Sequence, residues 1–388
     1  MIRQRIDRLL RGRRCTLLGV GPMSHNCVDA AIELANEHNV PIFLIASRRQ
    51  VECEEMGGGY VNGWHTRSFA DYVVARDKKS NIILARDHGG PWQNEREVKE
   101  QLSLRLAMDS AKASYLEDIR AGFQKIHIDP SIDLHGGATT DDIIDRVIDL
   151  YEFCWSHARS LGREILFEVG TEEQTGATSG REDEMNYTLS QIRVRCQSAD
   201  LPQPTFVVVQ TGTKVMEARN VGSFDSPVRV AHELAVEIQV PKMLDICRHH
   251  GVLLKQHNTD YMSDESLKWH PRLGIHAANV APEFGVAETR ALLEMFLHAR
   301  REDLAERFIS IAKGSRKWIK WVYPDVSYTD LQLATFCGHY IFGEPEVIEL
   351  KRELQGSFSS SRLSLDEHLK NRVKQAIARY LNHFRLVL

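Results

Sequence analysis

The sequence predicts an α/β protein, a (β/α)8 TIM barrel with a C-terminal helical appendage. Short apolar runs alternate with helical patterns eight times between residues 15 and 300, and such alternation is typical of a parallel sheet. Eight repeats in fewer than 300 residues match the size of a closed barrel. An open, doubly wound sheet is the alternative, but it needs no eighth repeat, and the chain contains no GxGxxG turn.

The predicted strands share one form, because each is a short apolar run with a helical stretch after it. They are CTLLGV (15–20), PIFLIA (41–46), NIILAR (81–86), KIHID (125–129), EILFEVG (164–170), TFVVVQ (205–210), VLLKQH (252–257) and RLGIHAAN (272–279). The helix after the fourth strand opens with a Thr/Asp capping signal, which marks its first turn.

The chain begins with an Arg-rich amphipathic stretch, MIRQRIDRLLRGRR. Its apolar positions, Ile2, Ile6, Leu9 and Leu10, have helical spacing, and an apolar run begins at once at Cys15. Such a stretch can be a transit peptide, but a structural helix that closes the bottom of the barrel accounts for it better.

Beyond about residue 300 the patterns are helical. We therefore expect two parts, the barrel with its closing helix over residues 1–300 and a helical extension packed on the barrel over residues 301–388. Whether the extension covers one side of the barrel or mediates oligomerisation stays open.

Composition narrows the classes of function. The 43% hydrophobic and 26% charged residues are those of a globular protein. A net charge of −4, without a Lys/Arg run interleaved with aromatic residues, argues against a nucleic-acid partner. No uninterrupted apolar segment is long enough to cross a membrane. The seven cysteines are scattered without a CxxC pair, which favours free thiols in a reducing compartment and a cytoplasmic location.

Polar side chains stand at the expected ends of all eight strands, where the βα loops of a barrel converge and catalytic groups lie. The candidates for proton transfer are Asp87, Asp129 and Glu168, those for metal binding are His88, Glu168 and His257, and those for substrate binding are His25, Arg48, Arg49, Gln50, His127, Gln210, Lys214, Asp260, His276 and Asn279. Each has a structural alternative when taken singly, such as an ion pair for an arginine or a helix cap for Asp129. Taken together they indicate an active site, because barrel geometry directs them at one mouth.

Imidazole and carboxylate ligands suit Zn²⁺, and also Mn²⁺ or Co²⁺. Asp87 and His88 cannot point the same way in an extended strand. The sequence Gly89-Gly90-Pro91 directly after them can turn the chain and bring both to the mouth.

These residues resemble a known family. ILARDHGGPW is similar to the third-strand motif of class II, metal-dependent ketose-bisphosphate aldolases. A closer resemblance is to the D-tagatose-1,6-bisphosphate aldolase subunit family, the larger "non-catalytic" subunits that are also labelled tagatose-6-phosphate kinases. The motifs that carry it are SHNCVDAAIEL, Gln50-Val51 with Gly58-Gly59-Tyr60, DHGGPW, AGFQKIHIDPS, EVGTE (168–172), VVVQTG and QHNTDY.

The resemblance implies that Asp87 is an acid/base and that His88 and His257 bind a metal. Two departures stand against a simple aldolase. The third histidine ligand expected after strand six is replaced by VVVQTGTK, with Gln210 and Lys214, and HNTDYMSDE stands where a glycine-rich phosphate loop is expected. Arg48 and Arg49 also stand where the family has smaller polar residues.

The sequence leaves two main functions open. The first is a metal-dependent aldolase or 4-epimerase of a ketose or ketose phosphate, in which Asp87 moves the proton of the hydroxyl at the breaking carbon–carbon bond. The second is a non-catalytic subunit that stabilises a separate aldolase chain, and either protein can form a homo-oligomer. A sugar-binding barrel is a weaker third possibility. A kinase is excluded, because the chain shows no phosphate cradle such as GxxxxGK[ST].

Overall fold

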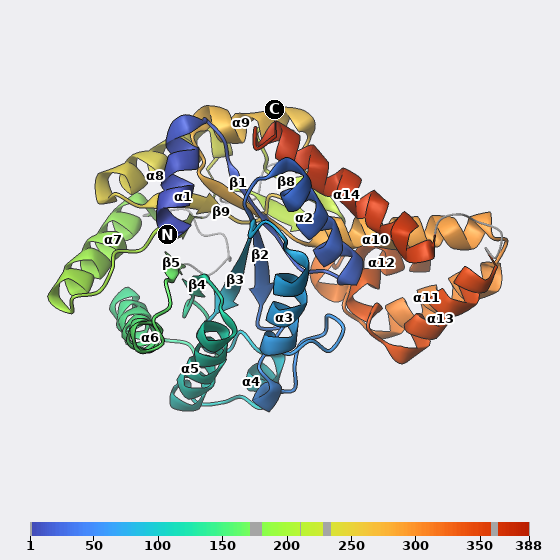
Figure 1. Ribbon diagram of the computed structural model, residues 1–388, viewed down its shortest axis with the longest axis horizontal. Coiled ribbons are helices and arrows are strands. Elements are labelled where there is room, and N and C mark those ends of the chain that lie inside the picture. Colours follow the sequence, from blue (N-terminus) through green and yellow to red (C-terminus); the bar gives the residue numbers. More distant parts are fainter. Residues whose placement is uncertain (1, 171–180, 210, 228–233, 358–363, 388) are drawn as a thin grey trace.

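The computed structural model describes residues 2–170, 181–209, 211–227, 234–357 and 364–387. Eight parallel strands close into a barrel in the order β1-β10-β9-β6-β5-β4-β3-β2, which confirms the predicted fold class. The strands are β1 (Leu17–Val20), β2 (Ile42–Ser47), β3 (Ile82–Gly89), β4 (Lys125–Ile128), β5 (Leu166–Val169), β6 (Phe206–Val209), β9 (Leu253–Gln256) and β10 (Ala277–Val280). Helices surround them on the outside (Figure 1).

Helices follow the strands as the alternation predicts, and more helices come after the last strand. Their bounds are α1 (Ile2–Gly12), α2 (His25–His38), α3 (Thr66–Arg76), α4 (Glu95–Lys99), α5 (Leu104–Ala121), α6 (Thr140–Ser160), α7 (Arg181–Ser198), α8 (Val236–His250), α9 (Asp264–Leu273), α10 (Pro282–His298), α11 (Glu302–Gly314), α12 (Asp330–Cys337), α13 (Pro345–Gly356) and α14 (Leu365–His383), with short 3-10 turns η1 (Glu54–Met56), η2 (Ile319–Trp321) and η3 (Gly338–Ile341). Thr139 caps α6 by accepting a hydrogen bond from the backbone N–H of Asp142, as the Thr/Asp signal indicates.

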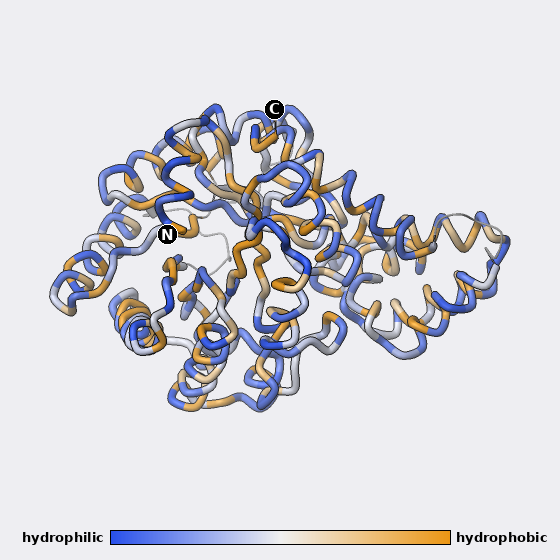
Figure 2. The backbone as a smooth tube through the Cα atoms, viewed as in Figure 1, coloured by the Kyte–Doolittle hydropathy of each residue, from blue (hydrophilic) through white to orange (hydrophobic). Residues whose placement is uncertain are grey.

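The strands are apolar on both faces because the barrel interior and the helical layer both exclude water. Figure 2 shows this hydrophobic centre surrounded by mixed helices. One exception is informative: Arg86 of β3 points into the helical layer and forms a bidentate ion pair with Asp118 of α5, at 2.6 and 2.7 Å. Both side chains are fully buried.

The last predicted strand needs a correction. RLGIHAAN was expected to be extended over 272–279, but α9 continues to Leu273 and Gly274 ends it with a φ of 90°. The strand begins only at Ala277. His276 therefore lies before the strand, at the amino-terminal end of the barrel.

A second difference lies after β6. Between β6 and α8, where only a helix is expected, the chain forms a small antiparallel hairpin, β7 (Lys214–Met216) and β8 (Arg219–Val221). The hairpin is not part of the barrel sheet, and Asn220 of β8 donates hydrogen bonds to the carbonyls of Asn258 and Asp260 in the loop after β9.

The helices after residue 300 do not form one uniform unit. Val373, Ile377 and Tyr380 of α14 belong to the same buried cluster as the barrel strands, and α14 packs against α2 and α10. In contrast, α11, α12 and α13 form a side lobe (Figure 1), and their buried apolar residues share a second cluster with residues of α10 and the first turns of α14. The division of the chain at residue 300 stays a prediction.

Two further expectations concern the chain as a whole. α1 is a helix, with Ile6 buried. All seven cysteines are free and buried, as their scattered positions indicate. None of the helices in the described ranges is long and apolar enough to cross a membrane.

Candidate active site

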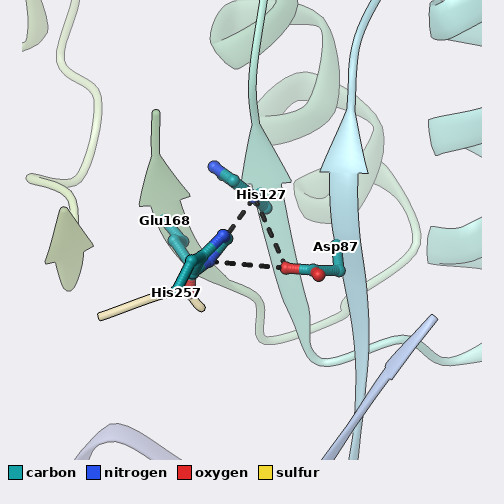
Figure 3. Close-up of side chains that lie close together, drawn as sticks. All are labelled: Asp87, His127, Glu168 and His257. Atoms are coloured by element: carbon teal, nitrogen blue, oxygen red, sulfur yellow. Dashed lines mark ion pairs between the residues drawn. The ribbon is translucent and has the colours of Figure 1, made fainter. Parts of the chain in front are cut away.

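Four titratable side chains from neighbouring strands converge at the carboxyl end of the barrel (Figure 3). Asp87 comes from β3, His127 from β4, Glu168 from β5 and His257 directly follows β9. Parallel strands in register place these positions side by side, because His127 pairs with Glu168 across β4 and β5. All four are buried.

The distances in this cluster are close to contact. The Nδ1 atom of His127 lies 3.7 Å from Oδ1 of Asp87 and 3.5 Å from Oε1 of Glu168. The Nε2 atom of His257 lies 3.8 Å and 3.7 Å from the same two oxygens. Four donor atoms thus surround one point, each contributed by a different strand or strand end.

Asp87 and His88 both reach the cavity, as expected, but the turn begins one residue earlier than Gly89. His88 itself has a left-handed φ of 44°, and the pairing of β3 with β4 shifts register between Arg86 and Gly89. This bulge re-aims the His88 ring relative to a regular strand.

The His88 ring lies beside the four-residue cluster, and its hydrogen-bond partner is Asp129. Its Nδ1 lies 2.8 Å from Oδ2 of Asp129, whereas its Nε2 is 3.9 Å from Oδ2 of Asp87. Asp129 also accepts hydrogen bonds from Gln93, at 3.1 Å, and from the Ser131 hydroxyl, at 2.5 Å. His88, His127 and Asp129 form a second group of possible ligands that shares His127 with the first.

The two histidines beside Asp87, His88 and His257, have pKa values shifted in opposite directions. Burial by itself lowers the pKa of His88, but Asp87 and Asp129 outweigh it and raise that pKa to about 9. Burial lowers the pKa of His257 to about 4. Burial also opposes ionisation of Asp87, yet His88 and His257 hold its pKa well below the ordinary range. At neutral pH the site therefore holds an ionised Asp87, a protonated His88 and a neutral His257.

Glu168 is held by two buried lysines. Nζ of Lys125 lies 2.5 Å from Oε2, and Nζ of Lys255 lies 3.0 and 2.9 Å from the two oxygens. Burial by itself raises the pKa of Glu168, but these lysines hold it well below its ordinary value. Lys125 precedes His127 by two positions, and Lys255 precedes His257 by two, so each pair shares one face of its strand.

Asn279 and Gly170 shape the cluster from two sides. The side-chain amide of Asn279 donates to Oδ1 of Asp87, at 3.0 Å, and lies 3.1 Å from Nε2 of His257. Gly170 leaves room for the His127 ring, because a Cβ there would lie 2.6 Å from Nε2 of His127. That Nε2 atom is buried and has no hydrogen-bond partner among the described residues.

Asp87, His127 and His257 of the cluster line a cavity of about 800 Å³, whereas Glu168 is fully buried and does not. Among the residues expected to bind substrate, the structure brings Arg49, Gln50, His127, Asp260 and Asn279 to its wall. Gln210 lies outside the described residues.

Four residues expected to bind substrate lie elsewhere. Arg48 is buried in ion pairs with Glu52, at 2.6 Å, and Glu97, at 2.7 Å. It therefore has the structural role that the sequence left open as the alternative to substrate binding. His25 packs against Trp64 with ring centroids 4.4 Å apart. The other two, Lys214 at the start of β7 and His276 below β10, are also absent from the cavity wall.

The cavity also contains residues that sequence reasoning missed. Lys317, Lys320, Trp321 and Tyr340, all from the chain after the barrel, line it together with Gln93. No local pattern marks the C-terminal residues, because tertiary packing alone brings them to the mouth. The two lysines that hold Glu168 did carry a signal, since a charged residue inside an apolar strand needs a buried partner.

The donor set is compatible with a divalent metal. A tetrahedral zinc site with bonds of about 2.0–2.2 Å requires donor–donor distances of about 3.3–3.6 Å, close to the 3.5–3.8 Å found here. Nδ1 of His127 accepts the backbone N–H of His88, at 3.1 Å, so an ion bound at this atom would displace that hydrogen bond. The low pKa of His257 keeps it neutral, the state in which imidazole binds metal.

Fold and site together define a (β/α)8 barrel whose titratable cluster lies at the carboxyl ends of the strands, where barrel enzymes hold their catalytic groups. The sequence profile of one family, D-tagatose-1,6-bisphosphate aldolase subunit GatZ/KbaZ-like, matches residues 2–297. The chain belongs to this family, which confirms the resemblance found in its motifs. Among curated proteins, no sequence matches the chain at a significant level.

Solved structures share the fold at low identity. A probable tagatose 6 phosphate kinase from Sinorhizobium meliloti is 18% identical with a TM-score of 0.74, over 95% of this chain and 100% of the other. The fructuronate-tagaturonate epimerase UxaE from Cohnella laeviribosi is 10% identical with a TM-score of 0.61, over 96% and 81%. Fructose-bisphosphate aldolase from Campylobacter jejuni is 9% identical with a TM-score of 0.56, over 100% and 94%.

Proposed function

We propose that the protein is a divalent-metal-dependent enzyme of the aldolase or epimerase type, acting on a ketose or ketose phosphate through an enediolate. The observation that carries the proposal is the convergence of Asp87, His127, Glu168 and His257, three of which, Asp87, His127 and His257, line a cavity. Family membership supports the same chemistry, because the family is described as an aldolase subunit.

His127, Glu168 and His257 would hold the metal, most simply Zn²⁺, with Mn²⁺ or Co²⁺ as alternatives, and Asp87 beside them is kept for proton transfer. When bound, such an ion supplies a Lewis acid that polarises a ketose carbonyl and stabilises negative charge on its oxygen. This set differs from the expected one by including His127 in place of His88. Glu168 is the residue of this set least available to a metal, because its two oxygens already accept hydrogen bonds from Lys125 and Lys255.

Asp87 is the proposed acid/base. It is ionised at neutral pH, so it can accept the proton of the hydroxyl on the carbon whose carbon–carbon bond breaks. That hydroxyl becomes the aldehyde, and the electron pair of the broken bond passes to the carbonyl side as an enediolate. Returning the proton re-forms the bond. Re-forming it after the aldehyde has rotated gives the 4-epimer.

Other residues of the cavity orient these groups. Asn279 fixes one oxygen of Asp87 by donating to it. Asp129 holds the protonated His88 ring, and this imidazolium can donate to a substrate oxygen. We therefore assign Asp129 to positioning His88 and Glu168 to the metal set, rather than either to proton transfer.

The test uses the Asp87→Asn variant. Purified protein with added Zn²⁺ or Mn²⁺ is supplied with ketoses and ketose phosphates, and cleavage and epimerisation are followed separately. We expect wild-type turnover to be lost in Asp87→Asn by at least the ~10²-fold typical of a removed acid/base, with unchanged circular dichroism. Turnover that survives this change, or that a chelator does not affect, contradicts the proposal.

One observation favours the second candidate, a non-catalytic subunit that stabilises an aldolase chain in the cytoplasm. Lys125 and Lys255 neutralise Glu168, which weakens the attraction of the site for a cation. This candidate predicts that the purified chain holds no stoichiometric divalent metal and that Asp87→Asn does not change the stability or activity of a complex with its aldolase partner.

A further inference from the structure

The mouth of the cavity carries a group of cations that the proposed chemistry does not use. Arg49 follows β2, and Lys317 and Lys320 belong to the segment 316–321, RKWIKW, which comes after α11. All three line the same cavity as Asp87 and His257. The segment lies outside the part of the chain that the family profile matches.

The segment 316–321 is fixed over the cavity from two directions. The ammonium of Lys317 binds both oxygens of Glu95 at the start of α4, at 2.9 and 3.0 Å. The carbonyl of Trp321 accepts the backbone N–H of Glu217, at 2.8 Å, in the turn of the β7–β8 hairpin. Contacts to two separate parts of the barrel mouth hold its side chains in a defined place.

The positive charges in this group are not balanced. Lys317 is paired with Glu95, but no carboxylate of the described residues lies within ion-pair distance of Arg49 or Lys320. Lys320 is exposed at the mouth. Partial loss of water and the repulsion of Arg49 and Lys317, opposed by the attraction of Glu95, lower the pKa of its ammonium to about 8. Cations held together with too few anions repel one another, and an anionic ligand relieves this repulsion.

The aromatic surroundings of Lys320 suit a sugar ligand with a charged end. Its Nζ lies 4.7 Å from the ring centroid of Trp321 and 4.9 Å from that of Tyr340. These aromatic faces keep the ammonium in place without consuming its hydrogen-bond donors. A ring or chain of carbon atoms can pack against the same aromatic walls while its charged end meets Arg49 and Lys320.

We propose that Arg49 and Lys320, supported by Lys317, form the subsite for an anionic group of the substrate, a phosphate or a carboxylate. The subsite takes the place of the glycine-rich loop that is absent after the seventh barrel strand. This inference rests on the proposed function, since it names the class of ketose that the cavity accepts. Cations at the mouth and Asp87 deeper in the barrel orient an anionic sugar with its reacting carbons toward the metal set.

The test measures binding rather than turnover. Full-length, Zn²⁺-supplemented protein is titrated calorimetrically with D-fructose 6-phosphate, D-fructuronate and D-fructose at two salt concentrations. We expect one of the two anionic probes to bind more tightly than fructose, with affinity falling at high salt. Tighter phosphate binding identifies a phosphate subsite, and tighter uronate binding a carboxylate subsite.

The Arg49→Gln/Lys320→Gln double variant should lose about 10- to 100-fold in affinity for the preferred anionic probe, as expected for lost charged hydrogen bonds. Lys320→Arg should retain most of it. The matched control is Lys313→Gln, which removes an equal charge from α11 where Lys313 pairs with Asp330. Its affinity should equal that of the wild type.

The two proposals fail in different ways. Salt-dependent anion binding that requires Lys320, without turnover of any ketose, leaves the subsite standing and removes the proposed function. Equal affinity for fructose and both anionic probes, or unchanged anion affinity in the double variant, overturns the subsite whether or not turnover is found.

Discussion

Lys255 places its ammonium between the two oxygens of Glu168, at 3.0 and 2.9 Å, where neither side chain is reached by water. Lys125 adds a second contact at 2.5 Å. A carboxylate at this depth is tolerable only with such partners, because an unpaired buried charge costs several kcal/mol. Lys125 and Lys255 therefore stabilise the candidate active site by compensating the buried charge of Glu168.

Replacing Lys255 with methionine should destabilise the protein by about 3–5 kcal/mol, the cost of leaving one partner of a buried pair uncompensated. Chemical denaturation of the wild type and the variant measures this difference. Lys268→Met is the control, because Lys268 forms an exposed pair with Glu265 on α9 and should cost about 1 kcal/mol or less. Equal, small losses in both variants would show that Glu168 does not depend on Lys255.

Gly170→Ala should impair the site without removing any functional group. The added Cβ would stand 2.6 Å from Nε2 of the His127 ring, so the ring must move and Nδ1 leaves its place beside Asp87. Zn²⁺ affinity should fall by about 10-fold or more, as for other changes that misplace a metal ligand. Gly314→Ala is the control, since nothing lies within 4 Å of a Cβ there. A Gly170→Ala protein that binds Zn²⁺ like the wild type would contradict this role of His127.

Metal addition should stabilise the wild type but not a variant that lacks His257. A ligand at 100 times its dissociation constant stabilises a native state by about 2.7 kcal/mol, which thermal unfolding detects readily. His257→Ala should lose most of the increase in Tm caused by Zn²⁺. His276→Ala should keep it, because His276 lies below β10 and outside the cavity. If His276→Ala and His257→Ala lose the increase alike, the metal lies elsewhere.

The barrel could be predicted because its determinants are local. Each strand is a short apolar run and each helix carries its own periodicity, and seven of the eight expected strands overlap the observed ones closely. RLGIHAAN was misplaced because its apolar residues suit either state, and the end of α9 is decided by Gly274 in a left-handed conformation. Because of that error, His276 was predicted at the carboxyl end of the barrel, whereas it lies at the amino-terminal end.

The site was harder to predict than the fold. Strand-end positions pointed to Asp87, Glu168 and His257, which the structure brings together. Whether His88 or His127 joins them depends on the bulge at His88, whose φ of 44° no sequence pattern predicts. Arg48 and Arg49 are adjacent and alike in sequence, yet Arg48 is buried against Glu52 whereas Arg49 lines the cavity. Only the structure therefore tells which of the two arginines lines the cavity.

The last prediction concerns pH. Asp260 accepts the backbone N–H groups of Ala281 and Glu283 at the start of α10, both at 2.9 Å. Burial, reinforced by the charge of Glu283, nevertheless raises the pKa of Asp260 to about 7. Between about pH 4 and pH 7 the native state then binds more protons than the unfolded chain, so this group lowers the free energy of unfolding as pH rises. Asp260→Asn keeps an oxygen for the two N–H groups and cannot ionise. Relative to the wild type, it should gain stability over this interval, on the order of a few kcal/mol by pH 8.

Denaturation at a series of pH values measures this difference in stability between Asp260→Asn and the wild type. Asp245→Asn, an exposed carboxyl on α8, leaves Asp260 in place and should follow the wild-type profile. A difference between Asp260→Asn and the wild type that does not change from pH 4 to pH 8 would mean that Asp260 does not titrate in this interval.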